Sequence, residues 1–228
     1  MKFKVRYILI FLILPFLINS QTNVDIGVPL DYEMQLIQRE IAAVYNPKTT
    51  NFTGNKYFYK SPKDAIIVLT NDNENIKALK VKTNYNLLEQ TFDIILDEKT
   101  LKLLPDKIEK VTFNDRVFLS VNDKFYELIE QNSNFSLLAD TFLEAYIPEY
   151  QPGIQEKPDP RYRKSNSVFL YYNDRFTYIE RRKNFLISMF QKSKSKEINT
   201  FYKKNKISPR DDNELKELFI EFFDFLSL

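Results

Sequence analysis

Residues 108–138 read IEKVTFNDRVFLSVNDKFYELIEQNSNFSLL. Short runs of β-branched and aromatic residues alternate here with Asn-Asp or Asn-Ser-Asn segments,. Asx side chains bond their own backbone and tolerate left-handed conformations, so these segments mark tight turns. Similar signals recur about every 8–12 residues from Ala65 to Ile147, which is the spacing of an antiparallel meander. The predicted strands are Ala65–Leu69, Ile76–Val81, Thr91–Leu96, Ile108–Phe113, Val117–Val121, Phe125–Ile129 and Phe135–Leu138.

Met1–Ser20 has the features of a signal peptide. Three basic residues precede a twelve-residue apolar run, Tyr7–Ile18,. A membrane-spanning helix needs about 20 apolar residues, so we expect cleavage before Gln21 rather than an uncleaved anchor. No cysteine follows the run, so no lipid-modified N-terminus is expected. The expectation is an exported, periplasmic protein whose mature form has no transmembrane segment.

Composition excludes several classes of enzyme. The 228 residues include no histidine, no cysteine and 3 glycines. Histidine and cysteine are required by Ser-His-Asp and Cys-His nucleophiles, common zinc sites, thiol redox centres and iron–sulfur clusters. Few glycines argue against phosphate-binding loops. No disulfide can form, so a hydrophobic core must stabilise the fold. We therefore predict no enzymatic activity and no cofactor.

Charge changes sign along the chain. Residues 21–156 carry 14 basic and 21 acidic side chains, residues 157–206 carry 14 and 4, and residues 207–228 carry 2 and 6. The change falls beside a segment rich in proline, which favours an extended linker. After the signal peptide at 1–20, we predict a first module at 21–147, a linker at 148–164 and a second module at 165–228.

Helical patterns flank the meander. Leu30–Val44 has helical apolar spacing and ends at Asn46-Pro47, and Val168–Ile179 predicts a hairpin turning at Asn173-Asp174,. The predicted fold is α+β: an N-terminal helix, a curled antiparallel β-meander forming a roll or partial barrel, a proline-rich linker, and a β-hairpin with a small C-terminal helical cluster. The last helix is predicted to start at Ser208-Pro209. Three apolar stripes define the cluster: Phe185–Phe190, Ile198–Tyr202 and Leu215–Leu226.

Several stretches carry a resemblance to a known family. They are Ile66–Asn73, Leu104–Phe113, Arg116–Phe118, Phe125–Ile129, Phe135–Leu138, Tyr171-Tyr172, Phe201–Ile207 and Phe222–Leu228. From about Asn51 to the end, the chain resembles an uncharacterised family of exported envelope proteins of the Bacteroidota group of bacteria. The resemblance implies an envelope location and a layout of strands followed by helices, and it implies no activity. Where relatives usually have a glycine in the C-terminal hairpin turn, this chain has Asn173-Asp174.

Paired carboxylates are the remaining route to catalysis. Glycosidases use two acids about 5–10 Å apart, and a meander could bring neighbouring turns to one rim. A carboxylate-dependent hydrolase of envelope polysaccharide therefore stays open, although acids in turns usually cap and solubilise. No Gly-centred loop with a distal Glu follows the acidic turns at 71–74 and 97–98, so no metal site is predicted,. The candidate acids are Asp93, Asp97, Asp115 and Asp123.

Aromatic and basic residues interleave over Tyr162–Lys183. This pattern is found on surfaces that bind single-stranded nucleic acid, but an exported protein rarely meets RNA, so no nucleic-acid partner is expected. An anionic lipid, a lipopolysaccharide phosphate or an acidic protein face fits that compartment better. A solvated basic face, balanced by the acidic last helix, is the simplest interpretation.

We predict a non-enzymatic accessory protein that binds a larger outer-membrane-associated assembly, such as transport or secretion machinery. The last helix is apolar on two sides, and its second side must pack on the N-terminal sheet or on a partner. A lipid- or glycolipid-binding module is an alternative, with acyl chains held in the curled sheet. A deep apolar cavity would favour lipid, whereas exposed aromatic surface would favour a protein partner. The candidate partner-binding residues are Arg181, Arg182, Lys183, Ile220, Phe223 and Phe225.

Overall fold

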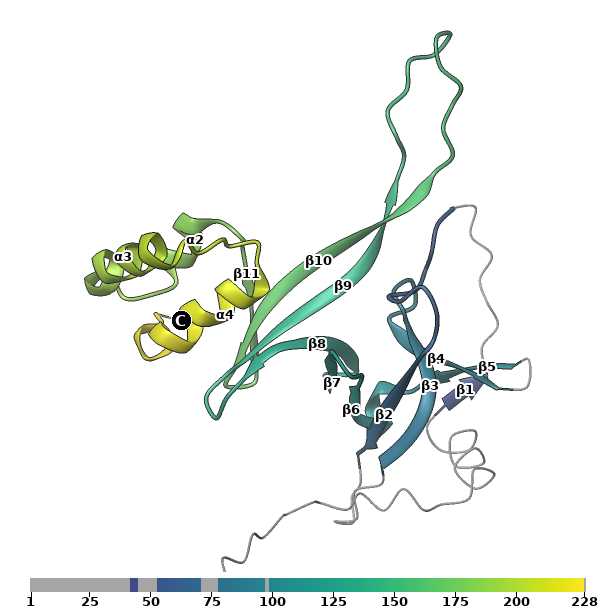
Figure 1. Ribbon diagram of the computed structural model, residues 1–228, viewed down its shortest axis with the longest axis horizontal. Coiled ribbons are helices and arrows are strands. Elements are labelled where there is room, and N and C mark those ends of the chain that lie inside the picture. The colour runs from purple at the N-terminus through teal and green to yellow at the C-terminus, as the bar shows by residue number, and fades with distance from the viewer. Residues whose placement is uncertain (1–41, 45–52, 71–77, 97–98, 228) are drawn as a thin grey trace, which may run out of the picture.

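A computed structural model describes residues 42–44, 53–70, 78–96 and 99–227. These residues form an open, antiparallel 11-stranded sheet with short helices at its C-terminal end (Figure 1). Neighbouring strands follow the order β1-β5-β4-β3-β2-β6-β7-β8-β9-β10-β11. The strands are β1 Ala42–Val44, β2 Lys63–Leu69, β3 Ala78–Asn86, β4 Thr91–Leu96, β5 Lys99–Leu103, β6 Ile108–Thr112, β7 Val117–Val121, β8 Lys124–Gln131, β9 Ser136–Tyr146, β10 Arg161–Tyr172 and β11 Arg175–Ile179.

The predicted meander is confirmed, and its tight turns have the expected geometry. Asn122 and Asp123 have φ of 51° and 58°, and Asn173 and Asp174 have φ of 49° and 57°. Both pairs form two-residue hairpin loops, because Val121 is paired with Lys124 and Tyr172 with Arg175. Left-handed conformations at both loop positions match the twist of the flanking strands, and Asn and Asp tolerate them.

The N-terminal helix predicted for Leu30–Val44 is not supported. Its last three residues form strand β1, which pairs with Leu101–Leu103 of β5. Backbone pairing with a neighbouring strand here overrides the helical spacing of the sequence. The remainder of that helix and the predicted signal peptide lie outside the described residues. The sequence also predicted a turn through residues 97–99, whereas Lys99 begins β5.

Two hydrophobic cores lie on the same face of the sheet. The first is enclosed by β2 to β8 and contains a cluster of aromatic rings whose centroids are 4.8–5.9 Å apart. The second lies between β9–β11 and the helices. Register connects the two, since Glu127 of β8 is paired both with Phe118 of the first core and with Ala139 of the second.

Three helices cover the second core. Each predicted apolar stripe lies largely on a helix, but Met189, Phe190 and Leu226 lie beyond the helix ends, and Phe190 and Leu226 form an isolated antiparallel bridge. The helices are α2 Lys183–Ser188, α3 Ser195–Asn205 and α4 Asp212–Phe222, the last followed by a 3-10 turn at Phe223–Phe225. The predicted start at Ser208-Pro209 is wrong. Asp211 is the N-cap, and its carboxylate accepts hydrogen bonds from the backbone N–H groups of Asn213 and Glu214 at 2.9 and 3.2 Å,.

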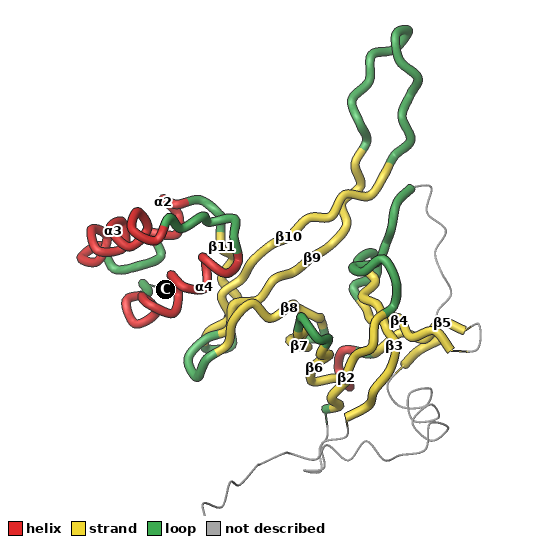
Figure 2. Tube along the Cα trace, in the orientation of Figure 1, coloured by secondary structure: helices red, strands yellow, loops and turns green. Residues whose placement is uncertain are grey.

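The proline-rich segment is the loop of a long hairpin. Strands β9 and β10 are paired from Tyr146–Arg161 to Ser136–Tyr171, and residues 147–160 join them. Residues 161–164 of the predicted linker therefore belong to β10. This hairpin projects beyond the rest of the fold (Figures 1 and 2). The second core includes Leu137 and Ala139 of β9, while Leu143 of the same strand packs against the first core.

Candidate interaction surface

Side chains of β9 and β10 alternate between the two faces of the sheet. Leu137 and Val168 point into the second core with the helices, whereas Leu138, Phe169 and Tyr171 point to the opposite face,. Because cross-strand partners lie on the same face, strand pairing shows that this opposite face extends across β8, β7 and β6. It carries a groove and an aromatic patch.

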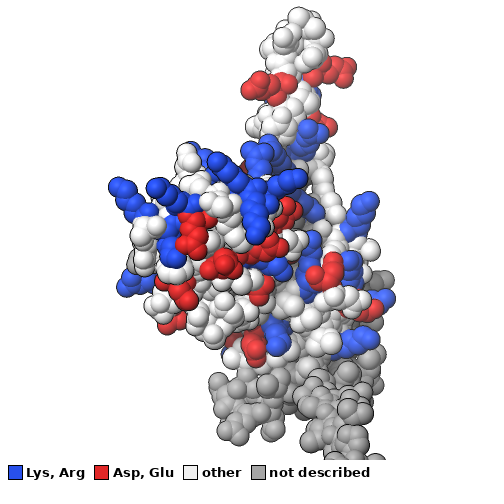
Figure 3. All heavy atoms as spheres, turned by 60° about the vertical axis from the view of Figure 1, so that its left-hand side comes forward, with Lys and Arg blue, Asp and Glu red and all other residues white. Residues whose placement is uncertain are grey.

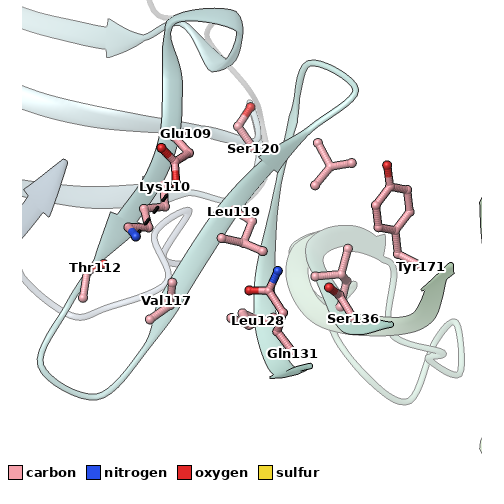
Figure 4. Close-up of a pocket in the computed structure, with 12 residues that line it drawn as sticks. Glu109, Lys110, Thr112, Val117, Leu119, Ser120, Leu128, Gln131, Ser136 and Tyr171 are labelled. Atoms are coloured by element: carbon pink, nitrogen blue, oxygen red, sulfur yellow. Dashed lines mark ion pairs between the residues drawn. The ribbon is translucent and has the colours of Figure 1, made fainter. Parts of the chain in front are cut away.

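The groove has a volume of about 480 Å³ and lies on strands β6 to β10. A β-bulge between Leu128 and Glu130 of β8 changes the register here, and bulges bend the strand that carries them,. Five aliphatic side chains line it, and Leu138 among them is fully buried. Figure 4 shows Tyr171 on one side of the groove and Lys110 with Thr112 on the other. We call these aliphatic lining residues the floor: Val117, Leu119, Val121, Leu128 and Leu138.

The aromatic patch adjoins the groove at Tyr171. Phe169 and Tyr178 are cross-strand partners, as are Tyr171 and Phe176, so these four rings share one face and the predicted hairpin is confirmed. Ring centroids of Tyr126 and Phe176 lie 5.1 Å apart, and those of Tyr171 and Phe176 lie 4.8 Å apart. Tyr178 is 52% exposed. We define the aromatic patch as Tyr126, Phe169, Tyr171, Phe176 and Tyr178.

Two tyrosines of the patch have shifted acidities. Burial raises the pKa of Tyr126, and the carboxylate of Asp140 adds to the rise. The Tyr171 hydroxyl donates a hydrogen bond to Asp174 at 3.0 Å, and this bond raises its pKa. Both hydroxyls therefore stay protonated and neutral at ordinary pH. The patch is thus an uncharged aromatic surface, with Lys124 lying 5.4 Å from the centre of the Tyr126 ring.

Sequence reasoning missed the groove and the contribution of Tyr126. The alternation of Phe125 and Tyr126 was visible, with Phe125 fully buried in the first core and Tyr126 on the other face. The missing information was which strands are neighbours, because Phe176 of β11 meets Tyr126 of β8 only across β9 and β10.

Among the predicted partner-binding residues, Arg181 makes contacts within the protein. Its guanidinium donates to the backbone oxygen of Arg210 at 2.7 Å and to the Asn166 side chain at 3.1 Å, and it lies 2.6 Å from the Asp212 carboxylate. These contacts tie the end of β11 to β10 and to the start of α4. The arginine therefore has a structural role that the sequence did not indicate.

Arg182 and Lys183 line a shallow hollow beside α2, with a volume of about 480 Å³. Arg182 pairs with Glu180, donating from Nε at 2.7 Å, and its side chain is 76% exposed. The Lys183 ammonium lies 5.3 Å from the centre of the Tyr202 ring. We define the basic hollow as Glu180, Arg182, Lys183, Asn184, Phe185 and Ser188.

The three predicted apolar residues of the C-terminal segment have different surroundings. Phe223 stacks on Phe135 with centroids 4.5 Å apart and meets the edge of Tyr172 at 5.3 Å. Phe225 is half-buried, and the Lys194 ammonium lies 4.2 Å from the centre of its ring. Ile220 is 53% exposed. The six residues thus do not form one continuous surface, since Phe223 and Phe225 pack against the second core.

The candidate acids have separate sets of partners. Asp93 is 1% exposed and accepts hydrogen bonds from the Asn86 amide at 2.9 Å and from the Tyr57 hydroxyl at 3.1 Å. Burial raises its pKa, while those hydrogen bonds oppose the rise. Asp115 is exposed and lies 3.9 Å from Lys63.

Asp123 is in the β7–β8 hairpin loop, and Asp97 lies outside the described residues. Within the described part of the chain, no group of three or more acidic side chains is placed to hold a metal ion. No helix in that part is both long and apolar enough to cross a membrane.

No protein-family model, curated protein or solved structure matches the chain. The resemblance to exported envelope proteins stays a prediction.

Proposed function

We propose that the protein is a non-enzymatic binding subunit of the cell envelope, and that it attaches to a larger outer-membrane-associated assembly through the groove and the aromatic patch. The observation that carries this proposal is the position of both features on the sheet face opposite the two cores. Apolar floor residues beside exposed aromatic rings are typical of the centre of a protein interface. The envelope location rests on the predicted signal peptide.

The floor and the rim of the groove suit an apolar side chain of a partner. Val117, Leu119 and Leu128 offer apolar contact, while Gln131 and Tyr171 offer hydrogen bonds at the margin. Tyr and Phe provide large rigid contact areas at low conformational cost. A partner that inserts an apolar side chain and covers the patch would remove this area from water.

The lipid-binding alternative has less support. An acyl chain would need space within the curled sheet, and the first core is filled by the protein's own rings. Tyr85, Phe92, Phe118 and Phe125 are all fully buried there and in mutual contact. The groove on the opposite face is bordered by charged Glu109 and Lys110.

Co-purification of two lysine variants from native envelope extract tests the proposal. Leu119→Lys places a charge in the groove, and Tyr178→Lys places one in the patch. Both positions are partly exposed strand sites, so folding should persist. We expect each variant to lose the proteins that co-purify with the wild type.

Ile220→Lys is the matched control, because Ile220 on α4 is as exposed as Tyr178, at 53% against 52%. It should retain the partner. Loss of the partner with Ile220→Lys but not with the other two would move the interface to α4 and refute the proposed surface.

A further inference from the structure

The loop at residues 147–160 concentrates exposed apolar side chains. Eight large apolar residues are exposed in the described part of the chain. Three of them, Ile147, Tyr150 and Ile154, lie in this loop, and a fourth, Tyr146, directly precedes it. Ile154 is 79% exposed. A cluster of this kind on a projecting element is typical of an interaction site. We call this loop the finger.

The backbone conformation of the finger is restricted before any partner binds. Its base is the paired part of β9 and β10, and four prolines in residues 147–160 fix their own φ angles,. A loop that is already restricted loses less conformational entropy when it binds. Thr53 also pairs with Pro160 and Tyr162 through backbone hydrogen bonds of 3.0 Å, which anchors one side of the base.

The finger is acidic, and its charge limits the kinds of surface that it can bind. Residues 147–160 carry three acidic side chains and one basic one. Figure 3 shows acidic side chains below the uncharged tip, and Lys and Arg side chains gathered on the upper part of the C-terminal module. A net negative charge disfavours an anionic membrane surface and favours an apolar site bordered by cations.

The chain itself carries such a site. The basic hollow contains Phe185 and the aliphatic stems of Arg182 and Lys183, and Glu180 of the hollow pairs with Arg182. The surrounding segment, residues 157–206, carries 14 basic and 4 acidic residues. The stems of arginine and lysine provide apolar surface while their charged ends stay in water. We propose that the finger of one molecule binds in the basic hollow of a second copy.

A finger cannot bind the hollow of its own chain. β11 ends at Ile179, opposite Val168, and α2 begins shortly afterwards at Lys183. β10 runs a further seven residues from Val168 to Arg161, about 23 Å at ~3.3 Å per residue, before the finger begins. In Figure 1, α2, which carries most residues of the hollow, lies well apart from the finger. The contact is therefore between molecules.

Sedimentation velocity of the purified protein over a concentration series tests this inference. The wild type should self-associate, and association should weaken in ~1 M salt, where the screening length falls to about 3 Å. Ile147→Ser with Ile154→Ser should weaken self-association at least tenfold. A wild type that stays monomeric at every concentration would overturn the proposal.

Mixing two defective variants gives a sharper result. The finger variant Ile147→Ser with Ile154→Ser changes only the finger. The variant Arg182→Glu with Ser188→Glu changes only the hollow. Each should be monomeric alone, and an equimolar mixture should form dimers, because one intact finger and one intact hollow remain. Failure of the mixture to associate would refute a finger-in-hollow contact.

Reversal of the charges on both the finger and the hollow should restore association between them. Glu149→Lys with Glu156→Lys in the finger should abolish association with the wild-type hollow and restore it with the Arg182→Glu, Ser188→Glu hollow.

Flotation with phosphatidylcholine vesicles is the control for membrane insertion. Binding to vesicles that Ile147→Ser with Ile154→Ser abolishes, without self-association, would contradict the proposal.

Discussion

Ile220 lies in the last turn of α4 and Phe223 begins the 3-10 turn that follows, and both were predicted to bind a partner. Phe223 packs between the rings of Phe135 and Tyr172, whereas Ile220 is largely exposed. Phe135 directly precedes β9 and Tyr172 ends β10, so the Phe223 ring packs within the protein. The two residues should therefore respond differently to the same substitution.

Phe223→Asp should destabilise the fold. Burial of a phenylalanine side chain contributes about 1.5–3 kcal/mol, which corresponds to a fall in Tm of roughly 3–12 °C for a chain of this size. Ile220→Asp is the control and should change Tm by a degree or two at most. Thermal unfolding followed by circular dichroism measures both. Equal Tm values for the two variants would show that Phe223 is not packed as described.

The Asp93 carboxyl should make stability depend on pH. Its folded pKa is raised, chiefly by burial, so the folded state binds a proton more tightly than the unfolded state,. The resulting stabilisation is present at pH values below the usual carboxyl pKa of about 3.9 and is lost as pH rises through the raised folded value. Asp93→Asn removes this titration.

Urea unfolding of wild type and Asp93→Asn at pH 7.5 and pH 4.5 tests that sign. The stability of the wild type relative to the variant should be greater at pH 4.5. A difference that is unchanged, or smaller at pH 4.5, would contradict the raised pKa. Measurement of the difference between the two proteins cancels the other titrating groups.

Among the elements, α4 depends on its cap. The Asp211 carboxylate accepts hydrogen bonds from two backbone N–H groups. Replacement of such a cap by alanine lowers the free energy of unfolding by about 1 kcal/mol. Asp211→Ala should lower Tm by about 2–4 °C. Glu221→Ala, at an exposed position of the same helix, should leave Tm unchanged. An effect of Glu221→Ala as large as that of Asp211→Ala would point to net charge rather than capping.

Strands with local sequence signals were more predictable than strands whose limits depend on pairing with distant segments. Alternating apolar residues and Asx turns are local signals, so Val117–Val121 and the hairpin at Asn173-Asp174 followed directly from the sequence. β5 was missed because Asp97 and Glu98 look like a turn that continues into Lys99. Ala42–Val44 was missed because its strand pairing comes from a distant segment.

The long β9–β10 hairpin lies where the net charge of the sequence changes sign. Prolines also cluster in its loop, yet the two sides of the loop are paired strands. Charge describes the surface, whereas the division of the cores depends on which strands pack together. The finger and the groove were invisible at the sequence level for the same reason.

At the scale of the whole molecule, both cores use one face of a single open sheet. The first lies among β2 to β8, and the second is covered by α2, α3 and α4. The opposite face of β6 to β11 carries the groove and the aromatic patch. Among the described residues, this division supports a binding role for the opposite face and an internal, stabilising role for the helices.

Site-specific photo-crosslinking in the native envelope tests this account most directly. A photoreactive phenylalanine analogue at position 119 or 178 should crosslink to a defined envelope protein and give the same product from both positions. The same analogue at Thr200, an exposed position on α3, should give no such product. No protein crosslink from positions 119 and 178, together with a product from position 200, would contradict a docking role for the groove and the aromatic patch.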